Sequence, residues 1–511
     1  MTVRYTIADC VAANARAFPD RVAIEVLDPR NGTGTTPVST LTFADVWRRV
    51  VGLADALGTV APGPNGPMVA ILLPQSSDAA LAYLACQVAR AAAVPVNTRL
   101  APAEIAYVLT DSGATVLLAA GELLDVARSV AAEVGGVRVV DADAVPTPAV
   151  APWPGPAGVG SSDDMAVIGY TSGTTGFPKG TWWTNDGWMT RLLQWSATFG
   201  LSPDRVLSTP GPIFHLSYGG LTLGALVVGA RTRIMAAFEP AVAAEEYAEH
   251  SDFVFLVPSM LAMIADWWRA NGRPPLGALR VMLSSGAPGP LSLLEEAFDV
   301  FPNASITEAY GWTEGGWVTY ETKRRGALVP HSVGWPMLGS EVEVLDDDGR
   351  PCPVGVAGEV VSRSVVPFLG YLNKPDASAA NVTPEGFTRS GDVGIWLEDG
   401  RLSIVDRVKD MIISGGENIY CAEVERILVE HPDVAEAAVV GLPDDTWGER
   451  VTALVVPRPG ASVDEVGVIE FCRARLAHYK CPKTVVFAAD LPRNSMGKVQ
   501  KFRVVEDLVG R

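Results

Sequence analysis

Residues 170–180 have the types and spacing best suited to chemistry. Their sequence is Tyr-Thr-Ser-Gly-Thr-Thr-Gly-Phe-Pro-Lys-Gly, so three glycines, four serine or threonine hydroxyls and one lysine fall within eleven residues. Glycine lets backbone N–H groups approach an anion closely, and hydroxyls and a lysine add donors and positive charge. The segment therefore predicts a loop that binds the phosphates of a nucleotide, with a Ser/Gly-rich surface loop as the alternative.

The spacing of this loop differs from that of the P-loop kinases. A Walker A loop places four residues between its first glycine and a Gly-Lys pair that is followed by a hydroxyl residue. Here Gly173 is followed by Gly176 and then by Phe177, Pro178 and Lys179. We therefore do not expect a P-loop kinase.

The elements around the loop predict an α/β fold. The apolar run 165–170 before the loop is typical of a buried strand, and ligand sites of α/β proteins lie at such strand ends. Upstream, a helical pattern opens at residues 42–47, a strand pattern covers 68–73 and an Ala-rich helical pattern covers 78–90. This alternation favours parallel sheets flanked by helices, and the Pro/Gly-rich residues 145–160 indicate a surface connector.

Length and charge narrow the class of protein. A chain of 511 residues exceeds what one core usually supports, so at least two domains are expected. The net charge of −18 opposes binding to nucleic acid or to anionic membranes. We find no secretory signal, no membrane-spanning run and no C-x-x-C pair among the six cysteines, which predicts a cytoplasmic protein with reduced thiols.

The loop and several later segments resemble the adenylate-forming superfamily, which includes acyl-CoA synthetases, adenylation domains of peptide synthetases and luciferases. The matching segments follow the family's order from Pro212 to Lys501. The resemblance implies a large N-terminal domain of parallel or mixed sheets flanked by helices, residues 1–408, and a small mobile α+β domain, residues 409–511. It further implies a carboxylic acid as substrate, with ATP and Mg²⁺.

The resemblance also implies where ATP and Mg²⁺ bind. Tyr310 would stack on adenine, Thr313 would bond the α-phosphate, and Glu314 and Thr171 would hold Mg²⁺, a cation that prefers oxygen ligands. The other residues of the expected ATP site are Ser172, Gly173, Thr174, Thr175 and Lys179 in the loop, Gly286, Ala287 and Pro288 beside the base, and Ala309 and Gly311 next to Tyr310.

Three further residues match the family's ribose and catalytic positions. Asp392 would accept hydrogen bonds from the ribose hydroxyls, with Arg407 on the same sugar, although either residue could instead form a surface ion pair. Lys498 matches the catalytic lysine, whose positive charge would stabilise the transition state when a carboxylate attacks the α-phosphate.

The acid pocket is expected near His215, Gly311 and Trp312. His215 matches an aromatic residue near the reacting carboxylate, to which we assign positioning without proton transfer. The family usually has a small or flexible residue at position 312, so the indole predicts a compact acid, either aromatic, carbocyclic or short and branched. Trp182, Trp183, Trp188 and Trp195 could add to the pocket, but tryptophans at such spacing are more often core.

The acceptor of the acyl group stays open. Lys409 matches the family's hinge, and Gly415 and Gly416 the loop that serves the second step. Residues 447–449 resemble a segment that docks coenzyme A, whereas Cys481 replaces a basic residue that assists CoA in some relatives. We expect CoA as acceptor; the alternatives are an amine, a carrier protein or, without specific support, luciferase-type oxygenation. The protein is expected to be a monomer or homodimer.

Overall fold

The computed structural model describes residues 5–151, 161–171, 178–407, 410–414, 417–444, 448–461, 463–493 and 499–509. The chain divides into two compact units. Unit 1 comprises Met1–Pro330, Gly334–Glu341 and Ser362–Thr388, and unit 2 comprises His331–Val333, Val342–Val361 and Arg389–Arg511. Within the residues that are described, no helix is long and apolar enough to span a membrane.

The first sheet of unit 1 carries the expected phosphate loop. Its strands follow the order β7-β6-β4-β5-β8-β9, with β3 (Pro62–Gly63) paired to β4. Neighbours from β7 to β8 are parallel, and β8 and β9 form an antiparallel hairpin. The strands are β4 (Gly66–Leu72), β5 (Ala92–Pro95), β6 (Val116–Ala119), β7 (Arg138–Asp141), β8 (Met165–Thr171) and β9 (Lys179–Thr184).

The second sheet of unit 1 is also mixed. In this unit its order is β16-β15-β14-β13-β12-β10-β11-β1-β2, and the strands from β14 to β1 are parallel. The strands are β1 (Val22–Leu27), β2 (Ser39–Thr42), β10 (Val206–Thr209), β11 (Arg231–Met235), β12 (Phe253–Leu256), β13 (Val281–Ser284), β14 (Ser305–Trp312), β15 (Gly316–Thr322) and β16 (Ser332–Pro336).

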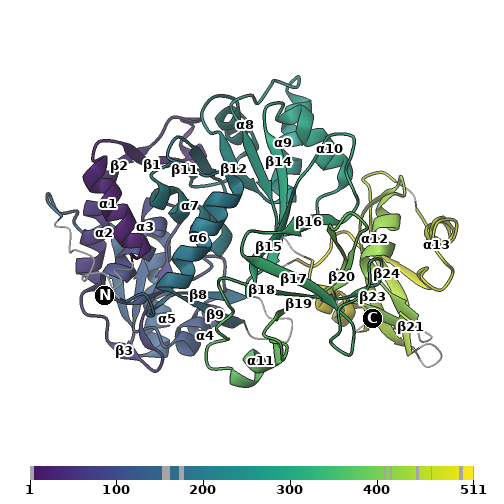
Figure 1. Ribbon diagram of the computed structural model, residues 1–511. Helices are drawn as coiled ribbons and strands as arrows, with labels where there is room; N and C mark the ends of the chain where they lie inside the picture. The colour runs from purple at the N-terminus through teal and green to yellow at the C-terminus, as the bar shows by residue number, and fades with distance from the viewer. Residues whose placement is uncertain are drawn as a thin grey trace. The chain divides into compact units, whose positions relative to one another are not determined.

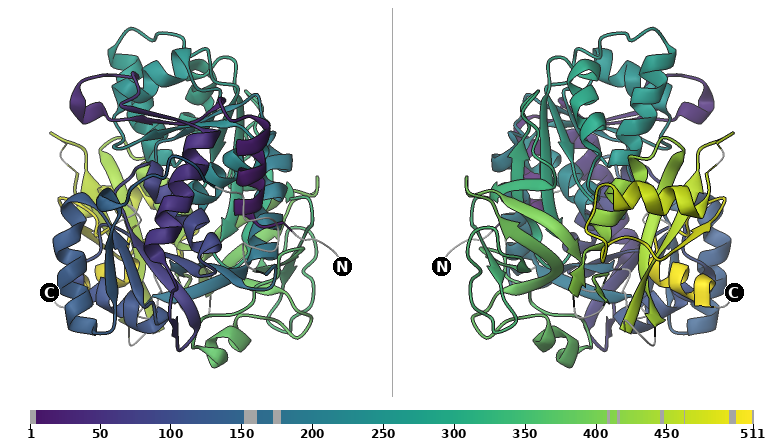
Figure 2. Two further views of the ribbon diagram at one scale, coloured as in Figure 1. Left: turned by 90° about the vertical axis from the view of Figure 1, so that its left-hand side faces the viewer. Right: turned by 90° about the vertical axis from the view of Figure 1, so that its right-hand side faces the viewer.

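Alternating side chains bury both faces of these sheets. In β12, Val254 and Leu256 join one core cluster, and Phe253 and Phe255 join another on the opposite face. Helices therefore cover both faces of each sheet, as Figures 1 and 2 show. One outer layer consists of α8 (Pro240–Glu249), α9 (Pro258–Ala270) and α10 (Leu291–Val300). The other outer layer consists of α4 (Pro102–Ser112) and α5 (Leu124–Val134). The layer between the two sheets consists of α1 (Ile7–Ala17), α2 (Phe43–Leu57), α3 (Ser77–Val88), α6 (Asn185–Phe199) and α7 (Leu216–Val228).

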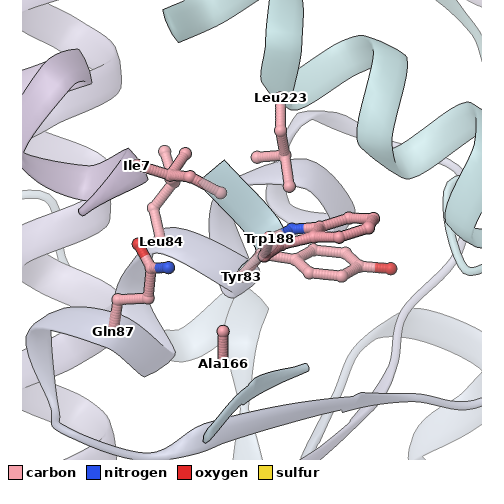
Figure 3. Close-up of a pocket in the computed structure, with 7 residues that line it drawn as sticks. All are labelled: Ile7, Tyr83, Leu84, Gln87, Ala166, Trp188 and Leu223. Carbon is pink, nitrogen blue, oxygen red and sulfur yellow. The ribbon is translucent and has the colours of Figure 1, made fainter. Parts of the chain in front are cut away.

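The layer between the sheets is tightly packed. Figure 3 shows Ile7, Tyr83, Leu84, Gln87, Ala166, Trp188 and Leu223 meeting at its centre, where no space for a water molecule remains. Gln87 Oε1 accepts a hydrogen bond of 3.0 Å from the backbone N–H of Ala8, and Gln87 Nε2 donates one of 2.8 Å to Asn185 Oδ1. Trp183, Trp188 and Trp195 are buried in the same core, whereas Trp182 is partly buried and packs against a different cluster of core residues. The expectation that such tryptophans are core residues is therefore confirmed for the first three.

Local sequence signals set several helix starts in unit 1. Thr6 and Thr42 begin α1 and α2 with capping boxes, in which Asp9 and Asp45 return a hydrogen bond to the cap. Thr184 caps α6 directly after β9. The expected strand over 68–73 and the expected helix over 78–90 correspond to β4 and α3.

Unit 2 contains two groups of hydrogen-bonded strands. One has the order β17-β18-β19-β20, and the other β22-β21-β24-β23, with β25 parallel to β24. The strands are β17 (Ser340–Leu345), β18 (Gly358–Ser364), β19 (Thr388–Trp396), β20 (Leu402–Arg407), β21 (Ile412–Ser414), β22 (Glu417–Ile419), β23 (Val434–Asp444), β24 (Gly448–Pro457) and β25 (Thr484–Phe487). The helices that accompany them are α12 (Cys421–Val429), α13 (Glu465–Arg473) and α14 (Lys501–Val509), and α11 (Pro375–Ala380) belongs to unit 1.

The predicted fold class is confirmed: large helix-flanked sheets come first in the chain, and a small α+β part follows. In this part, residues 422–429 lie in α12 and residues 437–440 lie in β23. Lys409 lies outside the described residues. The domain boundary expected there stays a prediction.

Candidate active site

Several predicted site residues follow the carboxyl ends of neighbouring parallel strands in unit 1. His215 comes after β10, Gly286 comes after β13, and Tyr310 lies near the end of β14. Because β10, β12, β13 and β14 run parallel in adjacent positions, these segments share one edge of the sheet. Ligands of α/β sheets bind at such an edge. Ala287 and Pro288 continue the turn after Gly286, whose φ is +93°.

The phosphate loop lies between the two strands of a hairpin. β8 ends at Thr171, of which only the backbone is described, and β9 begins at Lys179. Tyr107 donates a hydrogen bond to Pro178 O at 3.0 Å. The Tyr170 hydroxyl donates to Asp111 Oδ2 at 2.8 Å, so α4 anchors both ends of the loop. The predicted ligands Ser172, Gly173, Thr174 and Thr175 lie outside the described residues.

Glu314 sits in the tight turn between β14 and β15. Its Oε1 accepts a hydrogen bond of 2.6 Å from the hydroxyl of Tyr371. Lys179 Nζ lies 4.9 Å from the centroid of the Tyr371 ring. Tyr371 therefore connects the lysine of the phosphate loop to the carboxylate expected at the metal.

Sequence reasoning missed Tyr371. It lies 57 residues from Glu314, and no local pattern relates the two positions. A backbone bridge between Thr181 and Tyr371 and a hydrogen bond of 2.8 Å from Leu372 N to Gly180 O place it beside β9. Burial and the nearby Glu314 carboxylate raise the pKa of Tyr371, so the hydroxyl stays protonated and donates.

Replacing Tyr371 by phenylalanine should lower the efficiency of adenylate formation about tenfold. The variant removes one hydrogen bond to a charged group, worth about 1.5 kcal/mol, and leaves the Glu314 carboxylate less restrained. Pyrophosphate exchange at varied Mg²⁺ and ATP measures the effect. Tyr5, which is exposed, supplies the control variant Tyr5→Phe. Equal rates for Tyr371→Phe and wild type would contradict the assignment.

The donor atoms at this turn suit Mg²⁺. Within the part of the chain that is described, no three His, Cys, Asp or Glu side chains are arranged as a metal site. A site with one carboxylate fits Mg²⁺, which usually binds through one or two carboxylates together with substrate phosphates and waters. Glu314 is therefore the residue suited to hold it.

The remaining residues of the β14–β15 turn are closely packed. Gly311 faces the backbone of the opposite strand so tightly that a Cβ would lie 1.9 Å from Gly316 O. The rings of Tyr310 and Trp312 are tilted, with centroids 5.9 Å apart. Ala309 is buried and Thr313 half-buried. Only the backbone of glycine can reach so close to another strand, which explains why position 311 carries it.

His215 is the N-cap residue of α7 and is exposed. Its Nδ1 accepts a hydrogen bond of 3.4 Å from the backbone N–H of Ser217, which requires a neutral ring. The protein atoms around the ring disfavour its charged form and lower the pKa to about 4. Because solvent reaches the ring, this effect is weakened, but its direction agrees with the hydrogen bond. The geometry fits a positioning residue with a neutral ring.

The variant His215→Phe should leave the pH profile of pyrophosphate exchange unchanged between about pH 5 and 8. The pKa of His215 in the folded protein lies below the unfolded value of 6.5, so the ring is neutral above pH 6.5. Its contribution to stability is present above pH 6.5 and lost as the pH falls towards 4. Only the KM for the acid should rise. Loss of an inflection near pH 6.5 in the variant would show that His215 titrates during turnover.

Asp392 and Arg407 lie opposite each other on β19 and β20 of unit 2. Arg407 Nε is 3.1 Å from Asp392 Oδ1, and Asp392 is 7% exposed whereas the Arg407 side chain is 41% exposed. The ion pair orients a nearly buried carboxylate whose acceptor oxygens suit a diol. The structure thus brings together the two residues predicted to bind ribose.

Lys498 lies outside the described residues, but the residues up to Arg493 and from Val499 onwards are described. Arg493 and Val499 form a backbone bridge, and Gln500 N donates to Pro492 O at 2.8 Å. Lys501 Nζ then pairs with Glu425 Oε1 at 2.8 Å. These contacts fix the residues that flank Lys498, and the ion pair joins α14 to α12. Lys409, Gly415 and Gly416 also lie outside the described residues.

Comparisons with known proteins agree over most of the chain. The family model of AMP-binding enzymes matches residues 11–372, and the model of the AMP-binding enzyme C-terminal domain matches residues 423–498. A feruloyl-CoA synthase from an Amycolatopsis species is 36% identical over 91% of this chain and 93% of that protein. A 2-succinylbenzoate–CoA ligase from Bacillus licheniformis is 32% identical, over 96% and 98%.

Two solved structures have the same architecture. ATP-bound MatB from Rhodopseudomonas palustris superposes with a TM-score of 0.85 at 28% identity, covering 98% of both chains. The amide bond synthetase McbA from Marinactinospora thermotolerans gives a TM-score of 0.85 at 28% identity, covering 98% of this chain and 99% of that one.

Proposed function

This chain belongs to the family of AMP-binding enzymes, and from that premise we propose that it joins a carboxylic acid to coenzyme A through an acyl-adenylate. The observation that carries the first half-reaction is the set of contacts between Lys179, Tyr371 and Glu314. Through Tyr371, these contacts place Lys179, a cation beside the phosphate loop, near Glu314, a carboxylate suited to Mg²⁺. When bound, Mg²⁺ neutralises phosphate charge.

In the first step, a carboxylate oxygen of the acid attacks the α-phosphorus of ATP. The new bond joins the acyl oxygen to that phosphorus, and the bond to the bridging oxygen breaks, so that pyrophosphate leaves with the electron pair. Lys498 would stabilise the charge that grows between the two anions, and Lys179 the leaving phosphates. Asp392 and Arg407 would hold the ribose, and Tyr310 the adenine.

In the second step, a thiol attacks the acyl carbonyl and AMP leaves. The names of the relatives support CoA as the thiol, because a feruloyl-CoA synthase and a 2-succinylbenzoate–CoA ligase are both more than 30% identical over nearly the whole chain. Under this proposal, residues 409–511 swing about Lys409 and bring Gly415 and Gly416 to the site. Hinges commonly absorb such motion at a few terminal residues.

An amide-forming synthetase is the second candidate. McbA superposes on this chain as well as MatB does, with a TM-score of 0.85 for each. Both activities share the acyl-adenylate and differ only in the nucleophile. The fold therefore favours neither acceptor over the other.

One experiment separates the two candidates. The enzyme is incubated with ATP, Mg²⁺ and a panel of acids, and exchange of labelled pyrophosphate into ATP is scored. CoA, simple amines and a carrier protein are then offered separately, and AMP release and product mass are recorded. Thioester with CoA supports the proposal, and product from amines alone overturns it. Failure of exchange with every acid would overturn the first half-reaction as well.

The favoured acid is compact, and we propose an aromatic, carbocyclic or short branched acid. Trp312 is half-buried and packs on its own turn, where a Cβ on Gly315 would lie 2.8 Å from the indole. Such a fixed ring would limit the depth of a pocket beside Gly311. The name feruloyl-CoA synthase supports an aromatic acid, whereas FadD13 of Mycobacterium tuberculosis, a long-chain-fatty-acid–CoA ligase, is 32% identical.

Replacing Trp312 by glycine should shift the preference of the enzyme towards longer unbranched acids. Removing the indole opens space for added methylenes, and the ratio of kcat/KM between a long and a short acid should rise about tenfold. A series of straight-chain acids in the exchange assay measures this ratio. Trp335, which is 45% exposed, supplies the control variant Trp335→Gly. An unchanged preference would remove Trp312 from the pocket.

A further inference from the structure

Arg191 is a buried cation without a carboxylate partner among the described residues. Its side chain projects from α6 and the residue is 1% exposed. Nη1 donates to Gln194 Oε1 and Nη2 to the backbone oxygen of Val366, each at 3.2 Å. Both acceptors are neutral. Burial lowers the pKa of Arg191 to about 10, which still leaves the guanidinium charged at neutral pH.

Two other buried cations in unit 1, Arg233 and Lys323, form ion pairs with glutamate carboxylates. Arg233 is 4% exposed and lies 2.7 Å from Glu25 and 2.6 Å from Glu246. Lys323 lies 2.9 Å from Glu308 and 2.7 Å from Glu321. A buried charge that lacks an opposite charge costs stability. Arg191 is therefore poorly explained as a stabilising residue.

The guanidinium of Arg191 packs against the turn that carries Glu314. A Cβ built on Gly316 would lie 2.6 Å from Arg191 Cζ, so the planar group rests directly on the Gly316 backbone. Gly316 has a φ of +69°, a conformation that favours glycine. The Trp312 indole covers the neighbouring Gly315. The turn is thus held between an indole and a guanidinium.

Arg191 also holds Val366, a residue in the wall of a recess that Glu314 lines. Glu314, Gly315 and Val366 line a small recess of about 40 Å³, enough for one water molecule. Gln194, which accepts from Arg191, donates to the backbone oxygen of Leu338. Arg191 therefore connects α6 to the segment at Val366 through a hydrogen bond and to the β14–β15 turn through packing on Gly316.

We propose that Arg191 is a positioning residue that fixes the backbone of the turn so that Glu314 is aimed at the Mg²⁺ of the nucleotide. The planar fork of an arginine suits this role because two of its nitrogens are held by fixed acceptors while its face supports Gly316. The inference rests on the proposed function of Glu314. Arg191 itself touches neither metal nor substrate under this proposal.

The variant Arg191→Met tests the proposal, and Arg233→Met is its control because Arg233 is also a buried arginine of unit 1. Arg191→Met should raise the Mg²⁺ concentration for half-maximal pyrophosphate exchange about tenfold, because a mispositioned carboxylate binds the metal less well. Its melting temperature should change little, since no ion pair is lost. Arg233→Met should show the reverse pattern, with a lower melting temperature and an unchanged Mg²⁺ requirement. Arg191→Lys should recover only part of the loss.

A readout without turnover keeps the two proposals distinguishable. In enzyme labelled with fluorotryptophan, the ¹⁹F signal of Trp312, assigned with Trp312→Phe, should shift in Arg191→Met and stay in place in Arg233→Met, both without ligand. If Arg191→Met does not fold, Gln194→Met, which removes the Nη1 acceptor, replaces it. A wild-type Mg²⁺ requirement together with an unmoved Trp312 signal overturns the inference. If the wild-type enzyme shows no pyrophosphate exchange, the proposed function is overturned instead. In that case the ¹⁹F signal of Trp312 alone tests whether Arg191 positions the turn.

Discussion

Replacing Lys498 by methionine should reduce the rate of acyl-adenylate formation by a factor on the order of 10² to 10³. The first step brings a carboxylate and a phosphate together, and a cation between them stabilises charge that is largest in the transition state. The loss should therefore appear in kcat, with little change in the KM for ATP. Pyrophosphate exchange under saturating acid and ATP measures it.

The second half-reaction separates this role from general damage. Chemically prepared acyl-adenylate offered with CoA should give thioester at a rate close to that of wild type, because pyrophosphate is no longer involved. Lys483, an exposed lysine of unit 2, supplies the control Lys483→Met. If Lys498→Met lost both half-reactions equally, the lysine would be structural, and if it lost neither, the assignment would be wrong.

The variant Asp392→Asn should raise the KM for ATP by about 10- to 100-fold. A carboxylate accepts hydrogen bonds from both ribose hydroxyls, and each bond to a charged group is worth about 1.5–3 kcal/mol. Folding should be affected little, because the Arg407 side chain of the broken pair is 41% exposed. Steady-state exchange kinetics at varied ATP measure the KM.

A nucleotide that lacks one hydroxyl sharpens this test. Wild-type enzyme should discriminate strongly against 2′-deoxy-ATP or 3′-deoxy-ATP, and Asp392→Asn should discriminate much less. Asp399, which pairs with Arg401 at 2.5 Å on an exposed turn of the same unit, supplies the control Asp399→Asn. Unaltered discrimination in Asp392→Asn would place the ribose elsewhere.

Much of the fold could be predicted because its signals are local. The apolar run before the phosphate loop became β8, and the Ala-rich pattern over 78–90 became α3. The antiparallel partner of β8 was not predicted, because Lys179–Thr184 begins inside the glycine-rich segment and its pairing with β8 depends on contacts across the loop. For Trp183, Trp188 and Trp195, the spacing favoured a role as core residues, and all three are buried.

The candidate site could be predicted only where its residues carry a recognisable pattern. Glu314 and Asp392 stand in such patterns, and the cross-strand pairing of Asp392 with Arg407 agrees with what the resemblance implies. Tyr371 and Arg191 carry no pattern of their own. Tyr371 donates a hydrogen bond to Glu314, which is 57 positions away, and Arg191 donates one to Val366, which is 175 positions away.

The amino-acid sequence by itself determined the family, the α/β class and the chemical types in the site, because glycines, hydroxyls and carboxylates at fixed spacing are local properties of the chain. Only the tertiary structure decided which side chains support them. Parallel strands bring distant segments to one sheet edge, where Tyr371 meets Glu314 and Arg191 meets Gly316. Such contacts arise from packing between elements, and no spacing along the chain encodes them.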